Sequence, residues 1–145
     1  MQPQSIVNFS RIYLGSLALG IGNFIASYDS VMAELQADPV VAEMGFASLG
    51  FVLGTAAIGW GISLLIWFFI ARRASKIAKW ILVALTALGL AMLPSSLATM
   101  PTVSLVVTLV ITAMQLVAIY FLFRPDARAW FDSKGDPAAD ISTFE

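Results

Sequence analysis

The 145-residue sequence contains no cysteine and no histidine. Without cysteine the chain has no disulfide bonds and no thiol for redox chemistry, and without both residues it lacks the ligands of Cys/His zinc sites. The absence of histidine also excludes histidine-ligated haem and catalysis by an imidazole acid or base. These absences remove several classes of enzyme and redox protein at once.

Charge is scarce as well. Charged residues make up 12% of the chain and hydrophobic residues 59%, whereas soluble domains average about a quarter charged and about half apolar. The mean hydropathy is +0.88. With a net charge of -1, the chain also lacks the strongly basic face that is typical of nucleic-acid-binding domains. The composition indicates a membrane protein that does not bind nucleic acid.

Four long apolar stretches, at about residues 12–28, 46–71, 78–97 and 103–123, predict membrane-spanning helices. The longest runs from Phe46 to Ala71 without a charge, roughly 26 residues where about 20 suffice to cross the hydrocarbon core. A signal peptide is the rival interpretation of 12–28, but its apolar run exceeds the ~7 to 15 residues of such peptides. We expect an all-α, polytopic four-helix transmembrane domain over 1–131 and a mobile polar cytoplasmic tail over 132–145.

The connection between the first two stretches is acidic and carries no Lys or Arg. We expect residues 29–43 to form a loop outside the cytoplasm, although Val31, Met32 and Leu35 could form the apolar side of a short interfacial helix. Asp38 followed by Pro39 is typical of a helix start, so the second helix is expected to begin there, before the membrane.

The distribution of cations predicts the orientation of the chain. All eight Lys and Arg residues fall on the side of the N-terminus, the middle connection and the tail, which the positive-inside rule assigns to the cytoplasm. Both termini are therefore expected to be cytoplasmic. We expect six of these cations to lie at the level of the lipid headgroups: Arg72, Arg73, Lys76, Lys79, Arg124 and Arg128.

Small residues recur at helical spacing in the first two apolar stretches. Such residues let two helix backbones approach closely in a membrane. The first stripe is Ala18, Gly22 and Ala26, and the second is Gly50, Gly54, Ala57 and Gly61. We predict that both stripes are helix-packing faces. For the second stripe, packing against a neighbouring helix of the same chain is favoured over a groove for a ligand.

Ionisable residues are missing from the predicted hydrocarbon depth, which argues against a membrane carboxylate that carries protons. The polar residues at this depth are neutral: Asn23, Thr55, Ser63, Thr86, Thr108, Thr112 and Gln115. Thr108, Thr112 and Gln115 share one face of their helix and should face protein, since an amide exposed to lipid tails leaves its donors unpaired. Asn23 and Gln115 are expected to form interhelical hydrogen bonds.

Catalytic and nucleotide-binding motifs are missing too, including GxxxxGK[ST], GxSxG and HExxH. A Ser or Thr nucleophile would have no His or Lys base beside it in the membrane. We therefore predict no enzymatic activity, no catalytic residue, no metal site and no cofactor.

Size and number of spans are similar to those of the small multidrug-resistance transporters, but their first helix carries a glutamate and residues 12–28 contain no acid. Small fluoride channels insert in both orientations, unlike a chain with so asymmetric a charge distribution. The run Phe121–Phe131 and the connection Arg72–Trp80 resemble those of many small uncharacterised bacterial four-span proteins. That resemblance implies a bacterial inner-membrane location and no assigned activity.

Two functions remain open from the sequence. The first is a non-enzymatic accessory or scaffold role, in which the small-residue faces bind a membrane-protein partner, a second copy or a lipid. The second is a small channel or carrier for a neutral or hydrophobic solute, lined by Asn23, Thr108, Thr112 and Gln115.

Overall fold

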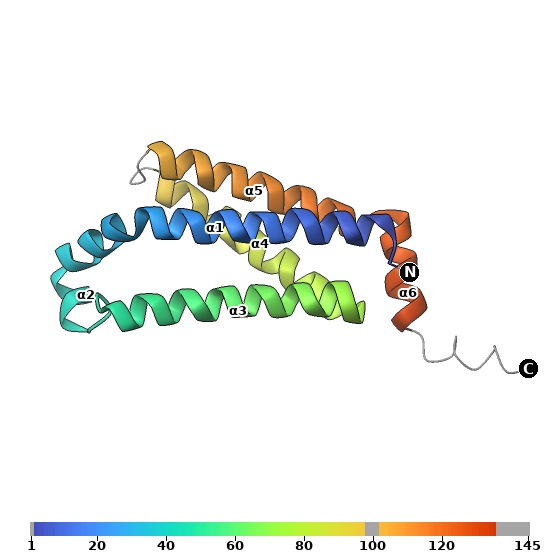
Figure 1. The fold of residues 1–145 in the computed structure, drawn as a ribbon, viewed down its shortest axis with the longest axis horizontal. Helices are drawn as coiled ribbons and strands as arrows, with labels where there is room; N and C mark the ends of the chain where they lie inside the picture. Colours follow the sequence, from blue (N-terminus) through green and yellow to red (C-terminus); the bar gives the residue numbers. More distant parts are fainter. Residues whose placement is uncertain (1, 98–101, 136–145) are drawn as a thin grey trace, which may run out of the picture.

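The computed structural model describes residues 2–97 and 102–135, and its chain is helical almost throughout (Figure 1). Four of its helices are long and apolar enough to cross a membrane, and no strand occurs in the described residues. In chain order the helices are α1 (Gln4–Ala37), α2 (Pro39–Glu43), α3 (Leu49–Arg73), α4 (Lys76–Leu97), α5 (Thr102–Leu122) and α6 (Pro125–Gly135). The all-α fold with four candidate spans is confirmed.

Helix α1 is longer at both ends than the predicted 12–28. It begins at Gln4 and ends at Ala37, so most of the predicted acidic loop 29–43 is helical and the loop prediction is wrong there. Residues 32–37 include Met, Ala, Glu, Leu and Gln, which all favour helix. The uncharged run therefore marked only the part of the helix at hydrocarbon depth.

A short helix and a turn separate α1 from α3. The Asp38 side chain accepts hydrogen bonds from the backbone N–H groups of Val40 and Val41 at 2.9 and 3.3 Å, which confirms it as an N-cap. The helix that it caps is α2, however, and not the start of α3. Gly45 follows the end of α2 and has φ +77°, a left-handed backbone conformation that favours glycine and interrupts the helix. Ser48 then caps α3.

Helix α1 lies alongside α5, whereas α3 and α4 meet near the residues that join them and separate toward the other end (Figure 1). The turn from α3 to α4 takes only Ala74 and Ser75, with Ala74 in the left-handed conformation at φ 50°. The residues that connect α4 and α5, 98–101, lie outside the described part of the chain. The antiparallel order brings both ends of the described chain to one end of the bundle.

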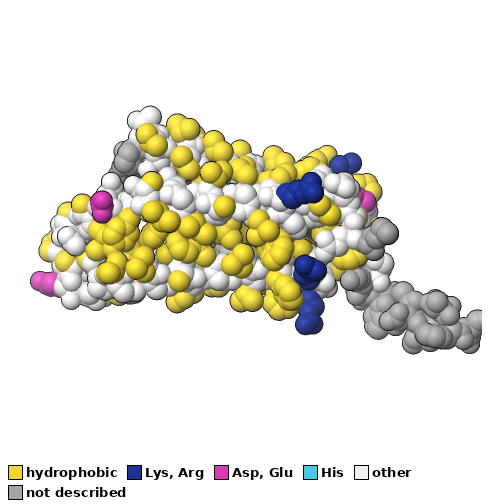
Figure 2. All heavy atoms as spheres, viewed as in Figure 1, with side chains coloured by type: hydrophobic (Ala, Val, Ile, Leu, Met, Phe, Trp, Pro, Cys, Tyr) yellow, Lys and Arg dark blue, Asp and Glu magenta, His cyan; other side chains and the backbone are white. Residues whose placement is uncertain are grey.

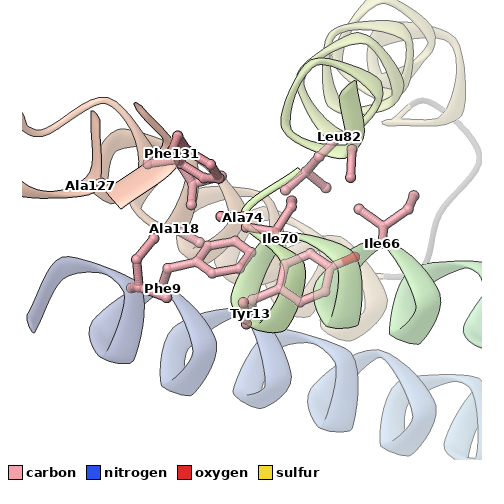
Figure 3. Packing of buried hydrophobic residues seen from close by; sticks show 13 residues of the cluster. Phe9, Tyr13, Ile66, Ile70, Ala74, Leu82, Ala118, Ala127 and Phe131 are labelled. Carbon is pink, nitrogen blue, oxygen red and sulfur yellow. The ribbon is translucent and has the colours of Figure 1, made fainter. Parts of the chain in front are cut away.

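The hydrophobic core gathers at that same end, which we call the α6 end. Figure 3 shows Phe9 and Tyr13 of α1 pointing toward Ile66 and Ile70 of α3, with Phe131 of α6 in the same cluster. Of the buried hydrophobic residues described, Val52 alone lies in the first half of α3. The bundle is therefore tightly packed at the α6 end and loosely packed at the opposite, α2 end.

Helix α6 changes the predicted boundary of the tail. Residues 132–135 belong to this helix, and residues 136–145 lie outside the described part of the chain. Phe131 of this helix is only 1% exposed and belongs to the core. The chain after α5 therefore folds back under the bundle instead of leaving it.

Candidate binding surfaces and cavities

The two ends of the bundle differ in charge, as Figure 2 shows for one face. Lys and Arg side chains gather toward the α6 end, and hydrophobic side chains cover the surface between the two ends of the bundle. Arg72, Arg73, Arg124 and Arg128 are exposed there, as predicted for cations that reach headgroups. This placement leaves their lipid contacts a prediction.

The two lysines of this set have partners within the chain. The Lys76 ammonium lies 2.7 Å from the Asp132 carboxylate, with both side chains more than half exposed. That cation lowers the pKa of Asp132 below its ordinary value. The Lys79 ammonium lies 4.8 Å from the centre of the Phe123 ring and 5.0 Å from that of Phe131, within range of cation–π attraction. Both lysines therefore contact residues of α6 from α4.

The second small-residue stripe faces away from the protein. A Cβ built on Gly50, Gly54 or Gly61 would meet nothing within 4 Å. At 3.6 residues per turn these positions lie opposite Val52, the buried residue of this half of α3. The expected packing against another helix of the same chain is therefore not seen, and a role for the stripe toward another molecule stays a prediction.

The first stripe is also turned outward. Ala18, Gly22 and Ala26 are exposed, on the side of α1 opposite its buried residues. The close approach of α1 to α5 occurs at a glycine outside the predicted stripe. A Cβ on Gly15 would lie 3.3 Å from the terminal methyl of Met114, tighter than ordinary contact. Gly15 lies three residues before Ala18 and so continues the row at helical spacing, although the predicted stripe did not include it.

An open apolar groove of about 690 Å³ lies between α1 and α3 at the α2 end. Its floor includes Gly20 and Gly59, and Leu35 and Val41 of the α1–α2 segment form part of its lining. Phe24 and Trp60 meet edge to face in this region, with ring centres 5.3 Å apart. Among the described lining residues, the Thr55 hydroxyl and the Trp60 indole N–H are the only polar side-chain groups. The groove therefore has almost nothing to select one apolar occupant over another.

A second cavity, of about 270 Å³, lies among α1, α3, α4 and α5 and is partly open. Its polar lining combines three residues predicted from the sequence with three others: Thr108, Thr112, Gln115, Tyr13, Ser63 and Thr86. Asn23 lines neither this cavity nor the groove, so the predicted set of four is only partly brought together. We call this space the polar cavity.

Three hydroxyl groups of the polar cavity donate their protons to backbone carbonyls. Tyr13 donates to the carbonyl oxygen of Ser63 at 3.3 Å and Ser63 to that of Gly59 at 2.9 Å. Thr112 donates to the carbonyl oxygen of Thr108 at 2.8 Å. Their oxygens keep lone pairs that can accept further hydrogen bonds. The expected interhelical hydrogen bond of Gln115 is not seen among the described residues.

No family model, curated protein or solved structure matches the chain. What the protein does must therefore be argued from its own residues.

Proposed function

We propose that this chain is a non-enzymatic integral membrane protein that acts as an accessory or scaffold subunit, holding a transmembrane helix of another membrane protein against the outer face of α3. The observation that carries the proposal is the outward glycine row, since Gly50, Gly54 and Gly61 have no protein atom within 4 Å of a built Cβ. Small residues bring helix backbones together in lipid, where no hydrophobic force drives association.

The proposed orientation has both termini in the cytoplasm of a bacterium and the chain in its inner membrane. It is supported by the cations around the α6 end and the acidic residues around α2. Single cysteines can test it, because the natural chain contains none. In intact cells an impermeant thiol reagent should label Glu43→Cys at once and Ser133→Cys only after the membrane is opened. The reverse pattern would contradict the orientation.

The partner proposal is tested by purification from the native membrane in a mild detergent, followed by mass spectrometry. The natural chain should retain a stoichiometric membrane protein, and Gly54→Leu should lose it because a leucine blocks close approach. Ala113→Leu, at an exposed position on α5, is the matched control and should retain it. A natural chain that purifies alone would count against the proposal.

A second candidate function, a carrier or channel for a neutral solute, is favoured by one observation. Thr108, Thr112 and Gln115 converge on one cavity with hydroxyl groups from three other helices. Transport sites of small membrane proteins often lie near the bilayer midplane, and these residues lie in the middle of α5. Glycerol flux into vesicles containing the protein, compared with empty vesicles, tests this function.

A further inference from the structure

The polar cavity contains an amide that has no hydrogen-bond partner among the described residues. The Gln115 side chain forms no hydrogen bond with another residue in the described part of the chain, although it lies on the lining. The sequence-based expectation was that this amide would bond to a neighbouring helix. At membrane depth an unsatisfied polar group costs free energy, so Gln115 needs a partner that is not part of the described chain.

The cavity offers both kinds of hydrogen-bonding group. The Gln115 amide supplies two N–H donors and a carbonyl acceptor. The hydroxyl groups of Tyr13, Ser63 and Thr112 donate their protons to backbone carbonyls, which leaves their oxygens available as acceptors. None of the lining residues is Asp, Glu, Lys or Arg. An ion would find no counter-charge here, whereas a neutral molecule with donors and acceptors would find partners.

The size of the cavity narrows the class of ligand. Its volume of about 270 Å³ is below the usual range for drug-sized ligands, about 300 to 1,000 Å³. Since a water molecule occupies about 30 Å³ of the liquid, the space corresponds to a small cluster of waters. A solute the size of glycerol or urea fits this space, and a lipid chain with no polar groups would leave Gln115 unpaired.

We infer that the polar cavity is a hydrated binding site for a small uncharged solute that both donates and accepts hydrogen bonds, with Gln115 as its main recognition group. The inference rests on the second of the two proposed functions and names the solute class for it. The inference is independent of the proposed binding to the outer face of α3, because the glycine row lies on the side of α3 opposite the polar cavity.

The first part of the test measures hydration. Thr112→Cys, nearly isosteric with the natural residue, places a thiol in the cavity of a chain that otherwise lacks cysteine. Val110→Cys, at a position 46% exposed on the outer surface of the same helix, is the matched control. In lipid vesicles the Thr112→Cys variant should react with methanethiosulfonate ethylammonium about tenfold faster than the control, because the reactive thiolate needs water.

The second part measures recognition. Glycerol or urea should slow the labelling of Thr112→Cys at least about twofold, and adding Gln115→Leu should remove that protection, because each lost hydrogen bond weakens binding several-fold. Gln115→Asn keeps the amide group and should preserve part of the protection. Labelling of Thr112→Cys no faster than that of Val110→Cys would overturn the inference. A labelling rate that neither glycerol nor urea changes would also overturn it, as would equal protection by these solutes with and without Gln115→Leu.

Binding and transport give separate results. Protection that depends on Gln115, together with a glycerol flux equal to that of empty vesicles, would support the binding site and contradict the carrier function. Protection together with a raised flux would support both.

Discussion

Ser5 and Asp126, 121 residues apart in sequence, are joined by two hydrogen bonds. The Ser5 backbone N–H donates to one oxygen of the Asp126 carboxylate at 3.1 Å, and the Ser5 hydroxyl donates to the other at 2.7 Å. The N-cap residue of α1, Pro3, provides no side-chain cap. Asp126 therefore satisfies an N–H group that α1 leaves free, and its negative charge suits a helix N-terminus. The start of α1 is tied to α6 in this way.

Replacing Asp126 with Asn should destabilise the α6 end. The substitution removes the charge and places an amide donor where Ser5 needs two acceptors, so the melting temperature in detergent should fall by several degrees. A double-mutant cycle with Ser5→Ala should show strong coupling between the two sites. Asp132→Asn, which breaks only an exposed ion pair, is the control and should have a small effect. Equal effects of the two Asp→Asn changes would argue against a stabilising role of the Ser5–Asp126 hydrogen bonds.

Acid should weaken the same contact. The hydrogen bond from the Ser5 hydroxyl is the main cause that lowers the pKa of Asp126 below its ordinary value of 3.8. A carboxylate with a depressed pKa in the folded state contributes stability above the unfolded pKa and loses it as the pH falls through the folded value. The melting temperatures of the natural chain and Asp126→Asn should therefore differ at neutral pH and converge below pH 3.8. A difference that stays constant with pH would contradict this.

Phe131 should contribute more to the unfolding free energy than an exposed aromatic residue does. It is 1% exposed and belongs to the core cluster, so Phe131→Ala should cost about 3 to 5 kcal/mol of unfolding free energy. Phe69→Ala provides the comparison, because Phe69 is 43% exposed and lies outside the core cluster. Unfolding in a denaturing detergent, followed by circular dichroism, measures both. Similar losses for the two variants would show that α6 is not part of the folded bundle.

Gly15 should tolerate a large side chain less well than Gly22. A Cβ at Gly15 already lies 3.3 Å from the Met114 methyl, whereas one at Gly22 meets nothing within 4 Å. Gly15→Leu should force α1 away from α5 and cost about 1 to 3 kcal/mol. Gly22→Leu should leave the thermal stability of the isolated chain nearly unchanged. The reverse order of stability in detergent would contradict the close contact between Gly15 and Met114.

The four spans could be predicted from the sequence because long uncharged runs report directly on the lipid environment. Their ends could not, since a helix continues past the hydrocarbon as long as its residues favour helix. The segment 29–37 shows this, because its acidic charge predicts a loop, whereas its Met, Ala, Glu, Leu and Gln residues favour helix and α1 continues to Ala37. The burial of Phe131 could not be predicted either, because most of the core cluster to which it belongs comes from other helices.

Periodicity identified which residues share a helix face but not which way the face turns. It placed Thr108, Thr112 and Gln115 together correctly, and the polar cavity then joins them to Tyr13, Ser63 and Thr86 from other helices. Ser63 and Thr86 were visible as polar residues at depth, but the order and rotation of the helices decide that they meet. The same limit applies to Gly54, whose row could equally have faced inward.

We propose above that the outer face of α3 receives a helix of another membrane protein. The most direct test replaces Ala57, in the glycine row, with the photoreactive residue benzoylphenylalanine and irradiates native membranes. The same replacement at Ala113, on α5, is the control. The account predicts a covalent adduct with a membrane protein from position 57 and none from position 113. No protein adduct from position 57, or equal adducts from both, would contradict it.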